Sequence, residues 1–456
     1  MNPTDLAFAG VVRQAQLIRS GELSSRELVE LYLDRIFRLD QSLNAFRVVM
    51  AEQALAEAQQ ADARRSAGED RPLLGIPVAV KDDTDVRGEV SAKGSIAHGP
   101  PATADDELVR RLRSAGAVII GKTNVPELMI TPFTETPWYG ATRNPWDLDR
   151  TPGGSSGGAA AAVAAGLVPL ATATDGAGSI RIPAACCGLV GLKPQRGRIP
   201  FAKPDWKGLD VHGFVTRTVA DSALALDCAG DFPIGLADAA ARPATKLRVA
   251  ISLGVPKGVI GSPDASQLGA VERVAGALRD LGHEVVEREA DYGLSGPRLI
   301  GRYLAGIREY AGSMAHPERL GRLTRGFVAL GLAPSFAIKR ILAAEAADRE
   351  RFVASFGDAD VLLTPMFTRL PFRIGELEGK PAAWVLNREI SFVPYPGMCN
   401  HTGQPAVAVP AGTTDDGFPL SAQIVGRPEA EPMLVGLAAQ LEQALDWPVR
   451  RPTMAA

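Results

Sequence analysis

Hydrophobic residues near the start of the chain recur with the spacing of an amphipathic helix. The stripe consists of Leu28, Leu31, Tyr32, Ile36 and Leu39. Residues three to four positions apart share one face of a helix, so the stripe predicts a helix with one buried side. Ser24 and Glu27 stand three positions apart just before it, which is typical of a capping box. We therefore expect this helix to begin next to Ser24.

Short apolar runs alternate with helical stripes along much of the chain. The first run, residues 73–80, predicts a buried strand that ends abruptly at Lys81. Further strands are expected at 117–120, 167–174, 247–252, 284–286 and 360–363, and helices around 108–112, 159–165, 271–278 and 434–445. This alternation is typical of an α/β layered fold with a mainly parallel sheet. We predict one continuous domain over residues 1–456, with a helical excursion near 296–355.

The helical excursion carries an apolar stripe of its own. Ile300, Tyr303, Leu304 and Ile307 recur there at helical spacing. Three interpretations are open for such a stripe: packing into the core, contact with a second copy of the chain in a homodimer, or closure over a substrate as a lid. Packing into the core is the most common of these.

Composition and charge exclude several classes of protein. Hydrophobic residues make up 46% of the 456 residues, so a sizeable core can form and global disorder is excluded. The 49 basic and 52 acidic residues give a net charge of −3, which argues against a nucleic-acid partner. Four scattered cysteines without a CxxC pair argue against a disulfide framework and a cysteine metal site. Without a secretory signal or a long apolar span, we expect a cytoplasmic protein with no membrane partner.

A glycine-rich turn follows the strand predicted at 167–174. Residues 175–179 read Asp-Gly-Ala-Gly-Ser, and the small residues let successive backbone N–H groups converge on one anion. Because Ser179 follows these donors at once, the turn can hold a nucleophilic hydroxyl beside an oxyanion hole. The alternative is a tight strand-to-helix turn with Ser179 as a helix cap, and this feature alone favours that alternative.

A nucleophilic serine needs a base, and Lys81 is the strongest candidate. It ends an apolar run, where partial loss of water lowers the pKa of an amine and makes it a proton acceptor. The alternative is a solvated lysine paired with Asp82 or Asp83. His98 and His401 lie in Gly/Pro-containing loops that can line a site, but neither stands in a recognisable serine-hydrolase context.

Ser155 offers a second candidate nucleophile. Residues 153–157 match G-x-S-x-G, the nucleophile elbow of α/β-hydrolases. That motif requires a buried strand immediately before it, whereas residues 143–152 form a polar segment with two prolines. The sequence therefore disfavours an elbow, and a plain glycine-rich helix entry remains the simpler alternative.

These segments together resemble the amidase signature family. The resemblance rests on residues 75–82, 121–124, 144–146, 152–158, 174–194, 217–221 and 402–406. It implies a large mixed, mainly parallel sheet covered by helices on both faces. It also implies hydrolysis of the C–N bond of a carboxylic amide through a serine acyl-enzyme, with no metal or other cofactor.

The resemblance also implies roles for individual residues. Ser179 matches the nucleophile, Ser155 the bridging serine with a cis peptide bond to Gly154, and Lys81 the third member of a Ser–Ser–Lys triad. The implied oxyanion donors are the N–H groups of Gly176, Ala177, Gly178 and Ser179, and the implied supporting residues are Ser156, Asp175 and Arg181. Ala177 stands where the family usually has glycine, so we expect its φ to stay in the range of ordinary residues.

Two segments with apolar side chains are expected to border the site in this family. They contain Phe133, Trp138, Tyr139, Phe392, Tyr395 and Met398. Their character favours a small-molecule aryl or alkyl amide, ester or carbamate as substrate, and loop packing is the equal alternative. Two other functions stay open: the glutaminase component of a glutamyl-tRNA amidotransferase, which works within a complex, and a catalytically silent binding protein.

Overall fold

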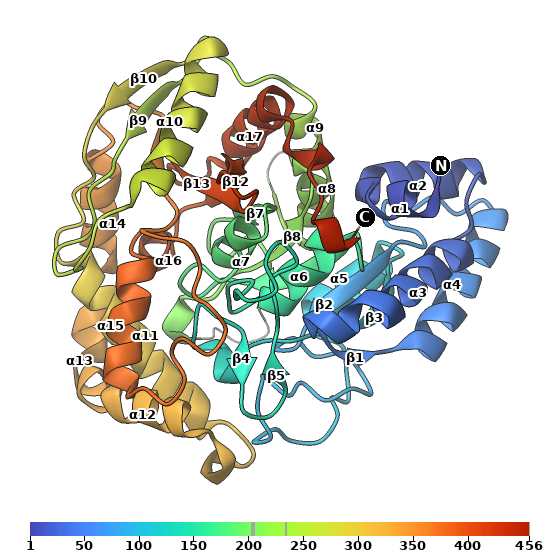
Figure 1. The fold of residues 1–456 in the computed structure, drawn as a ribbon, viewed down its shortest axis with the longest axis horizontal. Coiled ribbons are helices and arrows are strands. Elements are labelled where there is room, and N and C mark those ends of the chain that lie inside the picture. The colour runs from blue at the N-terminus through green and yellow to red at the C-terminus, as the bar shows by residue number, and fades with distance from the viewer. Residues whose placement is uncertain (202–205, 233–234, 456) are drawn as a thin grey trace.

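The fold is built around one large twisted sheet. The computed structural model describes residues 1–201, 206–232 and 235–455. Within them, eleven strands pair in the order β1-β3-β2-β6-β8-β7-β12-β13-β11-β9-β10, and β4 and β5 form a separate pair. Helices cover both faces of the large sheet (Figure 1). The mixed sheet between helical layers, predicted from the sequence, is confirmed.

The bounds of the elements follow the chain. The strands are β1 (Phe46–Val49), β2 (Pro77–Lys81), β3 (Val118–Thr123), β4 (Glu135–Thr136), β5 (Gly140–Ala141), β6 (Leu170–Thr174), β7 (Val190–Lys193), β8 (His212–Thr216), β9 (Arg248–Ile251), β10 (Glu284–Glu287), β11 (Val361–Pro365), β12 (Ala406–Thr413) and β13 (Pro419–Gly426). The α-helices are α1 (Pro3–Ala7), α2 (Gly10–Ser20), α3 (Ser25–Leu43), α4 (Ala51–Ser66), α5 (Glu107–Ser114), α6 (Gly157–Ala164), α7 (Arg181–Cys186), α8 (Val219–Ala229), α9 (Leu236–Ala240), α10 (Ala265–Asp280), α11 (Ser295–Gly312), α12 (Arg322–Leu330), α13 (Leu332–Ala343), α14 (Glu345–Ala354), α15 (Ala382–Phe392), α16 (Gly397–Thr402) and α17 (Glu431–Leu445).

The sheet contains less parallel pairing than the sequence predicted. Parallel pairs join β3 to β2 and β2 to β6, and also β11 to β9 and β9 to β10. The strands between these two groups pair antiparallel, from β6 through β8, β7, β12 and β13 to β11. In the parts of the chain that form the parallel pairs, a helix separates consecutive strands, as α5 does between β2 and β3 and α10 does between β9 and β10. The middle of the sheet instead includes β12 and β13, which are consecutive strands that pair directly and must run antiparallel.

The helix predicted from the first stripe is α3, and its start is confirmed in detail. The Ser24 side chain accepts a hydrogen bond from the Glu27 N–H, and the Glu27 side chain accepts one from the Ser24 N–H. The two bonds satisfy donors that a helix start leaves unpaired, as a capping box does. Leu28 and Tyr32 lie on the buried side of the helix.

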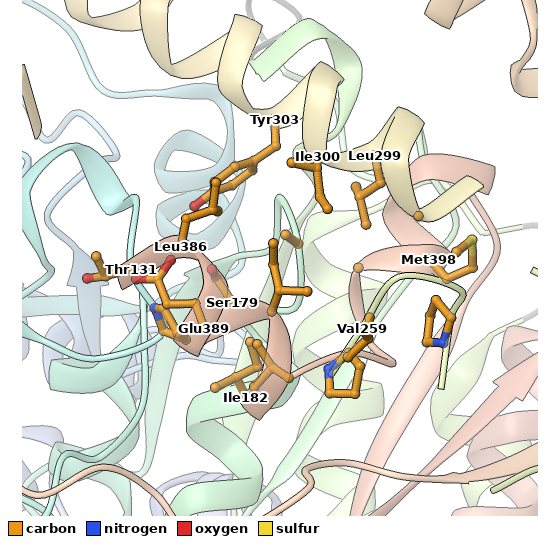
Figure 2. A pocket seen from close by; sticks show the side chains of 18 of the residues that line it. Thr131, Ser179, Ile182, Val259, Leu299, Ile300, Tyr303, Leu386, Glu389 and Met398 are labelled. Atoms are coloured by element: carbon orange, nitrogen blue, oxygen red, sulfur yellow. The ribbon is translucent and has the colours of Figure 1, made fainter. Parts of the chain in front are cut away.

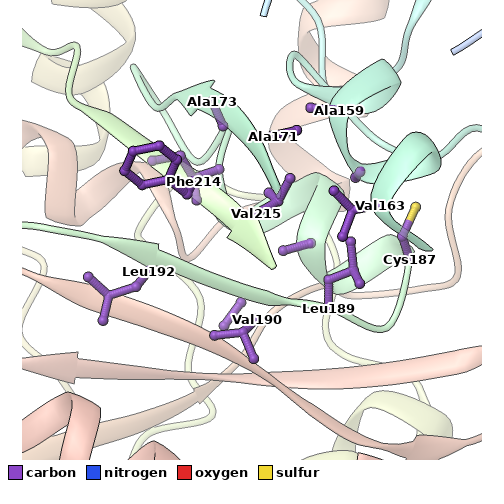
Figure 3. Packing of buried hydrophobic residues seen from close by; sticks show 14 of the residues in the cluster. Ala159, Val163, Ala171, Ala173, Cys187, Leu189, Val190, Leu192, Phe214 and Val215 are labelled. Carbon is purple, nitrogen blue, oxygen red and sulfur yellow. The ribbon is translucent and has the colours of Figure 1, made fainter. Parts of the chain in front are cut away.

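The alanine-rich helix α6 lies inside the molecule and packs closely on its neighbours. All of its residues from Gly157 to Ala164 are buried. A Cβ added to Gly158 would lie 2.5 Å from the backbone nitrogen of Asn124, so only glycine fits there. Figure 3 shows Ala159 and Val163 of α6 with buried side chains of β6, β7 and β8. This thin helix therefore reaches the centre of the sheet, where the candidate site lies.

The predicted excursion at 296–355 is helical, from α11 to α14. Leu304 and Ile307 of its stripe are buried in the core, while Ile300 and Tyr303 line a cavity. Phe336 on α13 is 85% exposed, which leaves an apolar side chain available for a contact between two copies of the chain. The homodimer stays a prediction.

No single helix in the described ranges is long and apolar enough to cross a membrane, whereas the bent pair α12 and α13 meets both criteria together.

Candidate active site

Lys81 lies at the end of β2 and is completely buried. Its Nζ donates a hydrogen bond to Ser155 Oγ over 2.8 Å and another to Thr174 Oγ1 over 2.5 Å. The same nitrogen lies 3.3 Å from Asp83 Oδ2. The solvated lysine considered as an alternative is therefore wrong, although its proposed pairing with Asp83 is present.

Thr174 links the lysine to the carboxylate. Its Oγ1 accepts the bond from Lys81 and donates to Asp83 Oδ2 over 2.6 Å. Burial alone would raise the pKa of Asp83, but the charge of Lys81 and the bond from Thr174 hold that pKa below its ordinary value. Asp83 is thus ionised and stabilises positive charge on Lys81.

The two serines reach the site from different segments. Ser155 lies just before α6, and its peptide bond to Gly154 is cis, as the resemblance implied. Residues 142–156 are all described and form only isolated bridges, so the strand that a nucleophile elbow requires is absent there. Ser179 lies before α7, whose N-cap position is Ile180, so Ser179 is not the helix cap. Ser155 and Ser179 line the same small cavity.

The glycine-rich turn is held in shape by the Asp175 carboxylate. Oδ1 accepts a hydrogen bond from the Gly178 N–H over 2.6 Å, and Oδ2 accepts one from the Ile180 N–H over 3.2 Å. Arg181, also fully buried, forms an ion pair with the carboxylate over 3.0 Å. Burial would raise the pKa of Asp175, but the Arg181 charge and its hydrogen bonds lower it below the ordinary value. The buried pair therefore fixes the loop that carries Ser179.

The candidate oxyanion donors differ in availability. Gly176, Ala177 and Ser179 border the small cavity, whereas the Gly178 N–H is already bonded to Asp175. Gly178 takes φ = 122°, a value open mainly to glycine, and Ala177 has no positive φ, as predicted. The Gly178 N–H is used within the turn, so Gly176, Ala177 and Ser179 remain as the predicted oxyanion donors.

A larger, mostly apolar cavity opens beside Ser179. Its walls come from segments far apart in the sequence, chiefly α11, α15 and residues 393–398 (Figure 2). The apolar side chains that line it include Ile182, Val259, Leu299, Ile300, Leu386 and Ile390. A hydroxyl at the edge of an apolar cavity, next to backbone donors, is an arrangement suited to attack on a carbonyl compound.

Comparison with known proteins shows the family of this chain. The amidase family model matches residues 27–435. The chain belongs to the amidase signature family. Over the full length of both chains it is 50% identical to AmiB2 of Mycobacterium tuberculosis, which is described as a candidate amidase.

Solved structures agree with the assignment. A 6-aminohexanoate cyclic dimer hydrolase superposes with a TM-score of 0.88 at 31% identity, covering 99% of this chain and 100% of that one. A bacterial aryl acylamidase of the amidase signature enzymes superposes with a TM-score of 0.84 at 26% identity, covering 96% and 98%. This amidase is therefore an enzyme that hydrolyses amides.

Only one of the six residues predicted to contact substrate lines the apolar cavity of this amidase, as far as the described residues show. That residue is Met398. Phe133 packs edge-on against Phe372, and Phe392 stacks on Phe367 at 4.8 Å between ring centroids. These rings belong to the core, so their apolar character reflects packing.

The remaining three predicted contacts are also used elsewhere. The Tyr395 hydroxyl donates to the Leu253 carbonyl over 2.8 Å. Trp138 donates to Glu127 over 3.1 Å, and the Tyr139 hydroxyl donates to the Ser95 carbonyl over 3.4 Å. In each of these three residues, the polar group of the ring forms a hydrogen bond with another segment of the chain.

One supporting residue, Asn400, could not be recognised from the sequence. Asn400 donates to Asp175 Oδ1 over 2.8 Å, and its own Oδ1 accepts a bond from Arg181 over 2.7 Å. The predicted supporting residue Ser156 bonds the Thr174 carbonyl over 3.4 Å. His401, a histidine considered for catalysis, is buried against Asp348, with 2.9 Å between Nε2 and Oδ2. Asn400 is 225 positions from Asp175, and only folding brings the two together.

Lys193 at the end of β7 gives a testable pH effect. Burial, assisted by the nearby Arg181 charge, lowers its pKa to about 7 from the ordinary 10.5. Between about pH 7 and pH 10.5, Lys193 is protonated in the unfolded chain but has lost its proton in the folded protein. The contribution of Lys193 to the free energy of unfolding therefore rises with pH in this range. We expect Lys193→Met to be more stable than wild type near pH 6, with a difference that shrinks from pH 7 to 10.

Urea unfolding at a series of pH values measures this difference. Lys257→Met, at an exposed position, serves as the matched control and should show a constant difference from wild type. A pH-independent difference for Lys193→Met would contradict a buried lysine that loses its proton on folding.

Proposed function

We propose that this amidase forms an acyl-enzyme on Ser179, with Ser155 and Lys81 moving the proton. The observation that carries the proposal is the 2.8 Å hydrogen bond between buried Lys81 and Ser155, in a cavity that Ser155 shares with Ser179. The proton acceptor is the unprotonated form of Lys81, which takes a proton from Ser155 while Ser155 takes one from Ser179. The Ser179 Oγ then attacks the carbonyl carbon of the amide.

Asp83 stabilises the ammonium group that this transfer creates. Its carboxylate lies 3.3 Å from Lys81 Nζ and is also bonded through Thr174. The arrangement parallels the carboxylate of a Ser-His-Asp triad, which stabilises the cation formed by the base. The proton then passes back through Ser155 to the departing amine, and water releases the acyl group.

The negative oxygen of the tetrahedral intermediate is bound by the turn at 176–179. Gly176, Ala177 and Ser179 border the cavity, and their N–H groups are the proposed donors. Loss of one such donor costs about 3–4 kcal/mol of transition-state stabilisation in other serine enzymes. Asp175 and Arg181 support this function by holding the turn in place.

The apolar cavity indicates the kind of substrate. An aryl or alkyl group fits among Ile182, Leu299 and Leu386. The side-chain amide of a glutamine would be the group attacked, and its charged α-ammonium and α-carboxylate groups would lose their hydrogen bonds to water in this cavity. We therefore favour an aryl or alkyl amide over the glutaminase function within an amidotransferase complex. Esters and carbamates present the same carbonyl and are expected as additional substrates.

Treatment with a small alkyl fluorophosphonate, followed by peptide-mapping mass spectrometry, tests the proposal. We expect an adduct on Ser179 that disappears in Lys81→Ala. Lys122→Met is the matched control, because Lys122 is also buried but contacts Asp82 and Ser91. An adduct on Ser155 would instead support the elbow mechanism. Absence of any adduct would favour a partner-dependent component of a complex or a silent protein.

A further inference from the structure

One acidic side chain interrupts the apolar cavity. Glu389 on α15 lines the cavity with its carboxyl group (Figure 2), although the residue is only 5% exposed. Its Oε1 is buried and has no hydrogen-bond partner in the part of the chain that the structure describes. A buried carboxyl without a partner is unfavourable, because it has lost its bonds to water.

The neighbouring hydroxyl does not satisfy this carboxyl. Tyr303 also lines the cavity, but its hydroxyl donates to the Ile130 carbonyl over 2.7 Å. Burial raises the pKa of Glu389 well above its ordinary value, so the protonated form is favoured. A neutral carboxyl offers one O–H donor and one carbonyl acceptor. Because the last torsion of a glutamate has a broad distribution, either oxygen can turn toward the cavity.

We infer that Glu389 is a specificity-determining residue that binds a second, uncharged amide or carbamate group in the acyl part of the substrate. The inference rests on the proposed function, since it takes Ser179 as the point of attack. A secondary amide carries one N–H and one carbonyl, which match the acceptor and the donor of the neutral carboxyl. A cationic group would require a buried ion pair in an apolar cavity, which has a large desolvation cost.

Matched fluorophosphonate probes test this inference. One probe carries a plain alkyl chain. Each probe of a second set has the same chain length, but two neighbouring methylenes are replaced by one secondary amide, and the position of this amide differs from probe to probe. A last probe ends in an ammonium group. The second-order rate constant for labelling of Ser179 is compared among wild type, Glu389→Gln, which stays neutral and polar, and Glu389→Met, which is apolar and of similar size. Circular dichroism confirms that each variant is folded.

We expect wild type to label at least one amide probe about 10-fold faster than the alkyl probe, a ratio typical of one satisfied buried polar group. Glu389→Gln should keep this preference, and Glu389→Met should lose it, so that the ratio between the labelling rate constants of the amide and alkyl probes falls to about one. Equal slowing of all probes in Glu389→Met, a retained preference, or no preference in wild type would overturn the inference. So would selection of the ammonium probe. Labelling of Ser179 by no probe would refute the proposed nucleophile itself.

Discussion

A Lys81→Ala/Ser179→Ala double variant is expected to hydrolyse amides barely more slowly than Ser179→Ala alone. In the proposed mechanism Lys81, Ser155 and Ser179 act as one unit, so removing the nucleophile already removes what the lysine contributes. Ser179→Ala alone should lower kcat by at least about 10⁴-fold, as loss of a nucleophile does in other serine hydrolases. Lys81→Ala alone should lower kcat by a similar factor, because Ser155 then has no group to accept its proton.

Steady-state hydrolysis of a chromogenic anilide measures these losses. Ser222→Ala is the control, since Ser222 is a buried serine on α8 that lines neither of the two cavities at Ser179. The control should keep wild-type activity. Losses that multiply in the double variant would show that Lys81 and Ser179 act independently, and substantial activity in Ser179→Ala would refute its role as nucleophile.

The second large effect is expected on stability, from Arg181→Leu. Asp175 and Arg181 are both completely buried, so the substitution leaves an uncompensated negative charge inside the protein. Breaking one partner of a buried pair costs about 3–5 kcal/mol in free energy of unfolding. The turn at 175–180 should also lose its anchor, and amide hydrolysis should fall with it.

Urea unfolding of a second variant distinguishes the stability lost through the unpaired charge from the stability lost through poorer packing. Asp175→Asn combined with Arg181→Leu removes both charges and should recover part of the lost stability. Arg26→Leu breaks an exposed pair with Glu30, in which both side chains are about half exposed, and should cost at most about 1 kcal/mol. Equal costs for Arg181→Leu and Arg26→Leu would mean that the buried pair does not hold the turn.

The chemical part of the site could be predicted from the sequence because each piece lies in a local motif. Lys81 ends an apolar strand, and Ser179 follows a turn of small residues, so both patterns are visible within a few positions. The structure places Lys81 within hydrogen-bond distance of Ser155, and it places Ser179 at the cavity that Ser155 borders. Their catalytic roles stay predictions until the variants are measured, as does the single domain over residues 1–456.

The walls of the cavity could not be predicted in the same way. An aromatic residue looks alike in sequence whether it packs in the core or contacts a ligand, and Phe133 and Phe392 pack in the core. Ile300 and Tyr303 belong to an ordinary amphipathic stripe, and nothing in the stripe marks which of its members face a cavity. The antiparallel middle of the sheet was missed because strand partners depend on the path of the chain and not on local pattern.

The candidate reacting groups and most of the cavity walls come from different parts of the sequence, and this affects how substitutions can alter substrate preference. The residues of the proposed proton path and the glycine-rich turn lie within residues 77–183, whereas α11 and α15 supply much of the apolar wall. Substitutions on these two helices can reshape the acyl binding space without touching a residue that moves a proton. Laboratory evolution of new preferences should therefore begin with combinatorial libraries at Leu299, Ile300, Leu386 and Ile390, where altered selectivity and intact chemistry are compatible.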